Sequence, residues 1–290
     1  YYSVRINKGS VRLCSTRLIA AMKTFVCVVL LLNTLVSGQQ GCGRSKIPSQ
    51  LKDGDGISGG PEAVAGSWPS HVELHNGQQS CAGALIDDQH VITTATCLRK
   101  AKPEMLRVHL GSHTRDTREN TEVAAKVLHH CESQSSFKLG NDFGILRREA
   151  KGNFTDVIRT ICLTEGSSEL PDKTILYTTG SDHKSAGGLC QARTESITNF
   201  RCGRDFQIAV HNTICTAADK DHSCSSDEGG PLMRVAGGVW CLEGVFTNQL
   251  NSHRKPGSPK RYTKVSRYID FIDGYRSLET IAQLKKYCDN

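Results

Sequence analysis

Residues 223–232 read SCSSDEGGPL, from Ser223 to Leu232. The glycine pair Gly229-Gly230 and the proline after it are typical of a turn, and the run Pro231 to Val235 has the length and composition of a short strand. An acidic pair, Asp227-Glu228, stands directly before the turn. This stretch therefore predicts a loop that leads into a β-strand.

Short apolar or alternating runs of the same kind recur between turn residues on both sides of this stretch. The runs before it are His71 to Leu74, Ala82 to Ile86, Val91 to Thr94, Leu106 to Leu110, Val123 to Leu128, Gly144 to Leu146 and Ile175 to Thr179. Those nearer to it and beyond it include Gln191 to Ile197, Thr213 to Thr216, Val239 to Phe246 and Arg261 to Val265. This spacing predicts an all-β barrel or sandwich, and no internal repeat or helical domain interrupts it.

The composition is that of a globular protein, and its charge does not favour a nucleic-acid partner. The chain has 290 residues, is 38% hydrophobic and carries a formal net charge of +7. Residues 1–38 hold five basic residues and no acidic ones, so 31 of the 36 basic residues remain against 29 acidic ones, a net charge of +2. A dedicated nucleic-acid binder normally shows a concentrated basic footprint.

The N-terminal residues read as targeting sequence. The first methionine is Met22, followed by Lys23 and an apolar run, Phe25 to Leu32, that is too short to span a bilayer. We interpret residues 22–38 as a secretory signal peptide cleaved before Gln39, and residues 1–21 as an upstream leader outside the mature protein. A genuine extension before the signal is the alternative.

Thirteen cysteines suit an oxidising compartment, and eleven of them, Cys42 to Cys288, follow the predicted signal peptide. Secretion and an extracellular location are therefore expected. Eleven is an odd number, so one thiol has no partner within the chain or pairs with another molecule.

The C-terminal residues Val265 to Lys286 place apolar side chains near helical spacing, which predicts a helix that packs on the domain. Gly274 offers a point at which this helix breaks in two, and Cys288 a staple for its end. A membrane-binding helix is the alternative, but the polar face mixes both charges.

Several ordered motifs resemble the chymotrypsin/trypsin family of serine proteases. These motifs are Ile57-Ser58-Gly59-Gly60, Gly66-Ser67-Trp68-Pro69, Cys81-Ala82-Gly83-Ala84-Leu85-Ile86, Val91-Ile92-Thr93-Thr94-Ala95-Thr96-Cys97, Asn141-Asp142-Phe143-Gly144-Ile145-Leu146 and Gly229-Gly230-Pro231-Leu232. The resemblance covers about Ile57 to Ile272 and implies two six-stranded antiparallel β-barrels. It implies a propeptide-like segment over 39–56, a protease domain over 57–276 with barrels of about 57–165 and 166–276, and a C-terminal extension over 277–290.

The same resemblance places the three catalytic positions at Thr96, Asp142 and Glu228, and only Asp142 keeps the family residue. Thr96 replaces the histidine that takes the proton of the nucleophile, and a threonine hydroxyl is too weakly basic for that role. Glu228 replaces the serine nucleophile and would bring negative charge to the site that stabilises an oxyanion. In the same loop Ser226 stands where the family has glycine, so catalytic inactivity is expected.

Substrate binding and activation are expected to be altered as well. The resemblance assigns the floor of the specificity pocket to His222, its backbone-binding wall to Thr247, Asn248 and Gln249, and a further pocket glycine to Lys260. Gly56, not Arg or Lys, precedes Ile57, so we expect an uncleaved, zymogen-like chain in which the charge of Asp227 needs another partner.

By the same resemblance, six cysteines form the pairs Cys42 with Cys162, Cys81 with Cys97 and Cys202 with Cys215. The remaining five are Cys131, Cys190, Cys224, Cys241 and Cys288. Cys190 is one candidate partner for Cys224, and the pairing of these five stays open.

Three surface features bear on binding. Residues His253 to Arg261 form a basic stretch with Arg254, Lys255, Lys260 and Arg261, which suits a sulfated glycan or an acidic protein face; a solvated turn without a ligand is the alternative. Asn153-Phe154-Thr155 is an N-glycosylation sequon. His129-His130 lacks a second ligand pair, so no metal site and no cofactor are expected.

These observations favour a secreted, non-catalytic serine protease homologue that binds a protein partner and so modulates a proteolytic, clotting or immune cascade. The alternatives are an active trypsin-like endopeptidase, which needs an unrecognised base and nucleophile, and a sulfated-glycan-binding protein. No membrane or nucleic-acid partner is expected.

Overall fold

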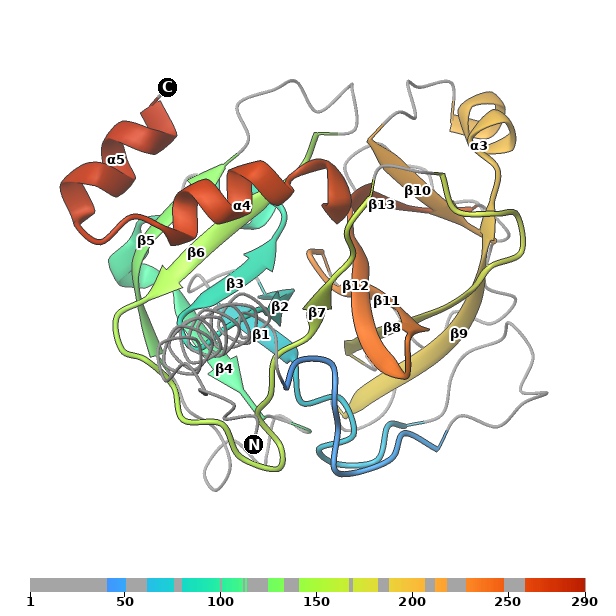
Figure 1. The fold of residues 1–290 in the computed structure, drawn as a ribbon, viewed down its shortest axis with the longest axis horizontal. Coiled ribbons are helices and arrows are strands. Elements are labelled where there is room, and N and C mark those ends of the chain that lie inside the picture. The colour runs from blue at the N-terminus through green and yellow to red at the C-terminus, as the bar shows by residue number, and fades with distance from the viewer. Residues whose placement is uncertain are drawn as a thin grey trace, which may run out of the picture. The chain divides into compact units, whose positions relative to one another are not determined.

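Two mainly antiparallel β-sheets form the framework of the described chain in this computed structural model (Figure 1). The structure describes residues 41–50, 62–75, 80–99, 101–111, 113, 125–132, 141–166, 169–181, 188–206, 212–217, 228–247 and 259–289, and of 125–132, 181, 205, 206 and 289 only the backbone. Cys42–Asn290 forms one compact unit. The predicted leader and signal peptide, residues 1–38, lie outside the described residues.

The first sheet is a closed barrel of six strands. They are β1 (His71–His75), β2 (Ser80–Leu85), β3 (His90–Thr93), β4 (Arg107–Leu110), β5 (Ala125–Glu132) and β6 (Gly144–Arg148), in the order β1-β2-β3-β6-β5-β4. Alternate residues of a strand face the interior, and in β4 Val108 and Leu110 are buried while Arg107 and His109 are half-buried. Closure leaves this barrel without an edge strand.

The second sheet has seven strands. They are β7 (Cys162–Leu163), β8 (Ile175–Ser181), β9 (Leu189–Ile197), β10 (Thr213–Thr216), β11 (Pro231–Ala236), β12 (Val239–Phe246) and β13 (Lys260–Lys264). The order is β11-β8-β9-β10-β13-β12-β7, and an additional β11–β12 pairing joins six of them into a ring. Strand β7 stays outside this ring and pairs in parallel with β12. The predicted chymotrypsin-like, all-β architecture is confirmed.

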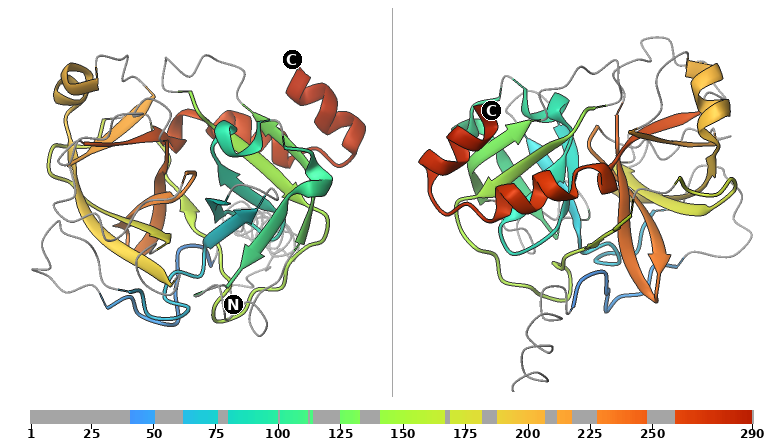
Figure 2. Two further views of the ribbon diagram at one scale, coloured as in Figure 1. Left: turned by 180° about the vertical axis from the view of Figure 1, so that it is seen from behind. Right: turned by 45° about the horizontal axis from the view of Figure 1, so that its top comes forward.

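The two barrels share one hydrophobic core and lie side by side (Figure 2). Trp68, which precedes β1, packs against Trp240 of β12 with ring centroids 4.8 Å apart. The indole N–H of Trp68 donates to Oε1 of Gln191 on β9, at 2.7 Å. His71 of β1 makes a second polar contact, with the hydroxyl of Thr179 at 2.9 Å. A buried tryptophan needs a partner for its N–H, so this bond fixes one barrel against the other.

The short helical elements lie between strands of these barrels. They are α2 (Ala95–Leu98), the 3-10 turn η1 (Pro103–Met105) and α3 (Asn199–Phe206). The Cys81–Cys97 disulfide ties α2 to β2, and the Cys202–Cys215 disulfide ties α3 to β10. Both bonds therefore fix a connecting segment to its own barrel.

The predicted C-terminal packing helix is present, and it is broken into two helices. A 3-10 turn, η4 (Val265–Arg267), leads into α4 (Ile269–Arg276), and α5 (Ile281–Asp289) follows after a short break. The break falls after Arg276 and not at Gly274. A Cβ on Gly274 would overlap the hydroxyl of Tyr287, so the glycine allows α5 to pack closely on α4.

A reciprocal cap starts α5. The hydroxyl of Thr280 accepts the backbone N–H of Gln283 at 3.2 Å, and Oε1 of Gln283 accepts the backbone N–H of Thr280 at 2.9 Å. This capping box satisfies donors that a helix start leaves without intrahelical partners. The Thr-x-x-Gln pattern was a signal in the sequence for the second helix.

The two helices lie over the first barrel, α4 beside its strands and α5 next to β5 (Figures 1 and 2). Arg276 at the end of α4 forms an ion pair with Asp87 at 2.7 Å, and Tyr275 packs edge-on to His90 at 5.8 Å. No helix in the described ranges combines the length and apolar character needed to cross a bilayer.

The described part of the predicted propeptide-like segment, residues 41–50, packs on the second sheet. Gly43 donates to the carbonyl of Thr160 at 2.7 Å and accepts the backbone N–H of Trp240 at 2.8 Å. A Cβ on Gly43 would overlap the backbone of Trp240, so only glycine allows this approach. The junction at Ile57 lies outside the described residues.

Candidate functional site

Three strand ends bring the predicted catalytic positions together. Thr96 lies on α2, directly after β3, and Asp142 lies two residues before β6. Strands β3 and β6 are neighbours, with Thr93 opposite Gly144. The side chains of Thr96 and Asp142 therefore meet at one edge of the first barrel. Glu228 comes from the second barrel, in the turn before β11.

Asp142 is the centre of the group. It is 1% exposed, and its Oδ1 accepts the backbone N–H of Thr96 at 2.9 Å. Its Oδ2 accepts two hydroxyls, from Thr96 at 2.9 Å and from Thr247 at 2.7 Å. A buried carboxylate is costly unless such donors satisfy it. The Asp142 side chain is therefore held by one residue from each barrel.

The turn at Glu228 is pressed against the first barrel. The carbonyl of Glu228 accepts the backbone N–H of Ala82 at 2.7 Å and lies 3.4 Å from Cys97 Sγ. The next residue, Gly229, has φ +82°, and a Cβ there would overlap the Thr93 hydroxyl and the Ala82 carbonyl. Only glycine combines a favourable positive φ with the absence of a Cβ. Gly229 therefore allows the turn at Glu228 to pack against the first barrel.

Arg261 is a further member of this group that the sequence did not reveal. It lies on β13 opposite Cys215 and is 3% exposed. Burial lowers the pKa of its guanidinium, and the negative charges of Asp142 and Glu228 partly offset that effect. Its carbonyl accepts the backbone N–H of Thr247 at 3.1 Å, so it also positions a residue that holds Asp142.

The burial of Arg261 corrects its predicted place in an exposed basic loop. Arg261 lies on β13, a strand paired on both sides, with β10 and β12, and its side chain is buried. Among the described residues Nη1 of Arg261 has no hydrogen-bond partner. The negative charges of Asp142 and Glu228 therefore offset the cost of burying the guanidinium charge. Lys260 is half-buried at the start of the same strand, and Arg254 and Lys255 lie outside the described residues.

The group therefore contains two carboxylates, a guanidinium and two hydroxyls, and no imidazole among its described members. The hydroxyls of Thr96 and Thr247 both donate a hydrogen bond to Asp142.

A family model described as Trypsin matches residues 57–272, which is most of the chain. The chain belongs to the trypsin family. The matched range spans both barrels and the whole Asp142 group.

Not every predicted site residue can be placed within the trypsin-family domain. Thr247 lies where the substrate-binding wall was expected, but its hydroxyl is turned to Asp142. The predicted residues outside the described ranges are His222, Ser226, Asp227, Asn248 and Gln249. The predictions for these positions stay predictions.

Three disulfides of the trypsin-family pattern are present as predicted. The bonded pairs are Cys42–Cys162, Cys81–Cys97 and Cys202–Cys215. Of the five cysteines left open, Cys190 and Cys288 are disulfide-bonded and Cys241 is a buried free thiol. Because Cys241 is 8% exposed, it is poorly placed for a bond to another chain.

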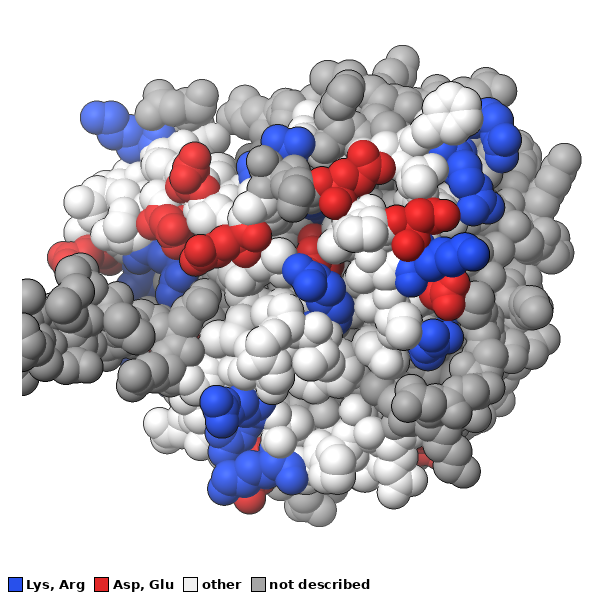
Figure 3. Space-filling view, turned by 45° about the vertical axis from the view of Figure 1, so that its right-hand side comes forward, with Lys and Arg blue, Asp and Glu red and all other residues white. Residues whose placement is uncertain are grey.

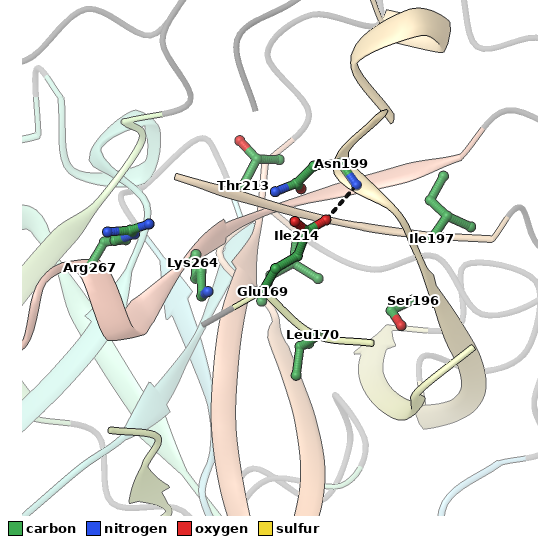
Figure 4. A pocket seen from close by; sticks show the side chains of 9 residues that line it. All are labelled: Glu169, Leu170, Ser196, Ile197, Asn199, Thr213, Ile214, Lys264 and Arg267. Atoms are coloured by element: carbon green, nitrogen blue, oxygen red, sulfur yellow. Dashed lines mark hydrogen bonds between the residues drawn. The ribbon is translucent and has the colours of Figure 1, made fainter. Parts of the chain in front are cut away.

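A separate pocket of about 180 Å³ lies in the second barrel of this trypsin-family chain (Figure 4). Lys264 and Arg267 come from β13 and η4, and Thr213 comes from β10. Glu169 also lines it, and its carboxylate accepts the backbone N–H of Asn199 at 2.8 Å. The Thr213 hydroxyl is buried, with no hydrogen-bond partner among the described residues. The part of the chain that the structure describes holds no cluster of metal-ligating side chains.

Proposed function

We propose that this chain is a non-catalytic, secreted member of the trypsin family that binds a protein partner and modulates a proteolytic, clotting or immune cascade. The observation that carries the first half is the bond from the Thr96 hydroxyl to Asp142, at 2.9 Å. In the serine protease mechanism this aspartate orients a histidine, which takes the nucleophile's proton. Here the aspartate holds a threonine, which has no basic atom to accept that proton at neutral pH.

The Glu228 position supports the same conclusion. A carboxylate is a poor nucleophile toward an amide, and its charge would repel the negative charge that develops on a tetrahedral intermediate. Arg261 lies close enough for its charge to interact with Glu228 and Asp142. The two carboxylates and the guanidinium therefore act as a structural ion cluster in place of a proton relay.

The charges on one face of the molecule favour a protein partner over a polyanion there. The face in Figure 3 shows Lys and Arg interspersed with Asp and Glu among the described residues, with no extended area of one sign. Interfaces between proteins tolerate such mixed charge, whereas polyanion binding needs a concentrated basic footprint. Secretion is supported by the disulfides and by the predicted signal peptide.

Active-site labelling tests the catalytic half of the proposal. The purified full chain is treated with a fluorophosphonate probe beside an active trypsin-like protease and beside an Asp142→Asn variant of the chain. We expect label on the active protease only. Label on the wild-type chain that Asp142→Asn abolishes would show an active endopeptidase with an unrecognised nucleophile.

Modulation of a protein partner is tested by a different measurement, the cleavage rate of a zymogen. The chain is added at increasing concentration to a trypsin-like protease that is cleaving its zymogen substrate, with heat-denatured chain as the control. We expect a saturable change in the cleavage rate that the denatured chain does not produce. An unchanged rate with every trypsin-like protease and zymogen tested would remove cascade modulation and leave the proposed catalytic inactivity unaffected.

The pocket in Figure 4 favours a second candidate function, which is the binding of a sulfated glycan. The lining of this pocket includes the cations Lys264 and Arg267 and the Thr213 hydroxyl, against the one carboxylate of Glu169. Chromatography on a heparin matrix tests it. An Arg267→Glu variant should elute at lower salt than wild type, while the control Arg44→Glu should not. If only Lys255→Glu shifts the elution, the basic loop and not the pocket binds the glycan.

A further inference from the structure

One disulfide of this chain lies directly beside its buried free thiol. Cys162, bonded to Cys42, is on β7, and Cys241 is on β12. The two strands pair in parallel, and Cys241 is the register partner of Cys162. Both residues are buried, at 8% and 7% exposed for Cys241 and Cys162. Three cysteines therefore meet at one point of the second sheet.

The distances allow either bond at Cys162. The Cα atoms of Cys42 and Cys162 are 5.0 Å apart. Neighbouring strands lie about 4.8 Å apart, so register partners have Cα atoms at a similar separation. Disulfides form across Cα separations of roughly 4.4–6.8 Å, a range that includes both pairs. Side chains of register partners also point to the same face of a sheet.

The N-terminal segment keeps all three cysteines close. Gly43, next to Cys42, is hydrogen-bonded to the backbone of Trp240, next to Cys241. The position that a Cβ of Gly43 would take is 3.0 Å from Cys162 Sγ. The segment thus runs across β7 and β12 at the level of the two cysteines.

We infer that Cys42, Cys162 and Cys241 form a thiol–disulfide exchange site, at which the bond of Cys162 moves between Cys42 and Cys241. The thiolate of Cys241 attacks Cys162 Sγ, the Cys42–Cys162 bond breaks, and Cys42 leaves as a thiolate that takes up a proton. One disulfide and one thiol are present before and after, so no oxidant or reductant is consumed. The exchange releases the covalent tether of residues 41–50.

The surroundings make this exchange slow at neutral pH and faster at alkaline pH. Burial and the negative charge of Glu243 raise the pKa of the Cys241 thiol, and Arg234, its register partner on β11, partly offsets this. Glu243 and Arg234 are the charged groups that act on this thiol within the described part of the chain. Because the thiolate is the attacking species, the rate follows its fraction.

Disulfide mapping tests the inference on the folded, full chain. The protein is held without added thiol at pH 7 and pH 9, trapped with N-ethylmaleimide, digested without reduction and analysed by mass spectrometry. We expect a Cys162–Cys241 peptide to accumulate together with an equal amount of alkylated Cys42, faster at pH 9. Alkylation confined to Cys241 at every time and pH would overturn the inference.

Two variants make the result specific. In Cys241→Ser, Cys42 should never be alkylated. In Cys42→Ser, Cys162 and Cys241 should be found bonded to each other, and two alkylated thiols there would overturn the inference. The bonds Cys81–Cys97 and Cys202–Cys215 are the internal control, since their loss in parallel with exchange would show scrambling through unfolding instead of a site.

Discussion

The hydroxyl of Thr96 donates to Oδ2 of Asp142 at 2.9 Å, and the backbone N–H of the same threonine donates to Oδ1. One residue thus satisfies both oxygens of a carboxylate that is 1% exposed. The remaining donor, Thr247, comes from the other barrel. The aspartate therefore joins the two barrels, and its neighbours are predicted to matter for stability.

Removing either hydroxyl from Asp142 should destabilise the fold. Thr96→Val and Thr247→Val keep side-chain volume but leave the carboxylate with one donor fewer, which costs about 1–3 kcal/mol for a buried charged group. Chemical denaturation with urea measures the free energy of unfolding. The matched control is Thr213→Val, since the Thr213 hydroxyl is buried with no partner among the described residues. Equal losses in all three variants would contradict this assignment.

The contributions of Arg261 and Glu228 to the free energy of unfolding should depend on each other. Glu228→Gln removes one of the two negative charges that compensate the buried guanidinium, so the free energy of unfolding should fall. In the background of Arg261→Met the same change should cost less, because no buried cation remains. A double-mutant cycle measures the coupling, which we expect to be about 0.5–3 kcal/mol. Additive losses would show that the two residues do not interact.

Asp87 should contribute stability that acid removes. Burial alone raises its pKa, but the hydrogen bond and charge of His90, the N–H of Gln89 and the charge of Arg276 outweigh burial, so its folded pKa is lowered. A lowered folded pKa gives stability that is complete above the unfolded value of about 3.9 and is lost as pH falls toward the folded value. Asp87→Asn should therefore be less stable than wild type at pH 7.

The difference between Asp87→Asn and wild type should shrink as the pH is lowered below about 4. Thermal unfolding at pH 7, 5, 3 and 2 measures it. Asp88→Asn is the control, because the Asp88 side chain is 39% exposed and its ion pair with Lys151, at 3.4 Å, is a surface pair. A difference in stability between the variant and wild type that stays constant with pH would mean that ionisation of Asp87 does not stabilise the fold.

Cys190 and Cys288, which are disulfide-bonded to partners not yet assigned, should belong to two different disulfides. Cys288 lies on α5, which packs next to β5, the strand that contains Cys131. We therefore expect a Cys131–Cys288 bond, which leaves Cys190 with Cys224 as the remaining pair. Peptide mapping without reduction identifies both bonds. A Cys190–Cys288 peptide would contradict this pattern.

Asn153 should carry an N-linked glycan when the chain passes through a secretory pathway. Its side chain is exposed in the segment between β6 and β7, and the sequon Asn-Phe-Thr is complete. Digestion with an N-glycosidase should lower the apparent mass of wild type but not of Asn153→Gln. An unchanged mass of wild type would leave the sequon unused.

Local patterns in the sequence were sufficient for the architecture. Short strands between turn residues predicted an all-β barrel or sandwich, and the resemblance of the ordered motifs to the chymotrypsin/trypsin family implied two barrels and one site for Thr96, Asp142 and Glu228. The helix break was misplaced at Gly274 because close packing against Tyr287, not chain reversal, requires that glycine. The Thr-x-x-Gln pattern at Thr280, which forms the capping box, was a missed signal for the start of the second helix.

The sequence by itself determined the β-rich fold and the family, because these depend on residue types at short or fixed spacing, and the family resemblance then implied the three disulfides. The assignment of Thr96, Asp142 and Glu228 to the catalytic positions rests on that same resemblance. Only the tertiary structure decided that Arg261 is a buried member of the Asp142 group and that Cys241 is the register partner of Cys162, which is bonded to Cys42. Both relationships depend on which strands pair side by side and on how the two barrels pack, and such contacts between distant segments leave no local pattern in the chain.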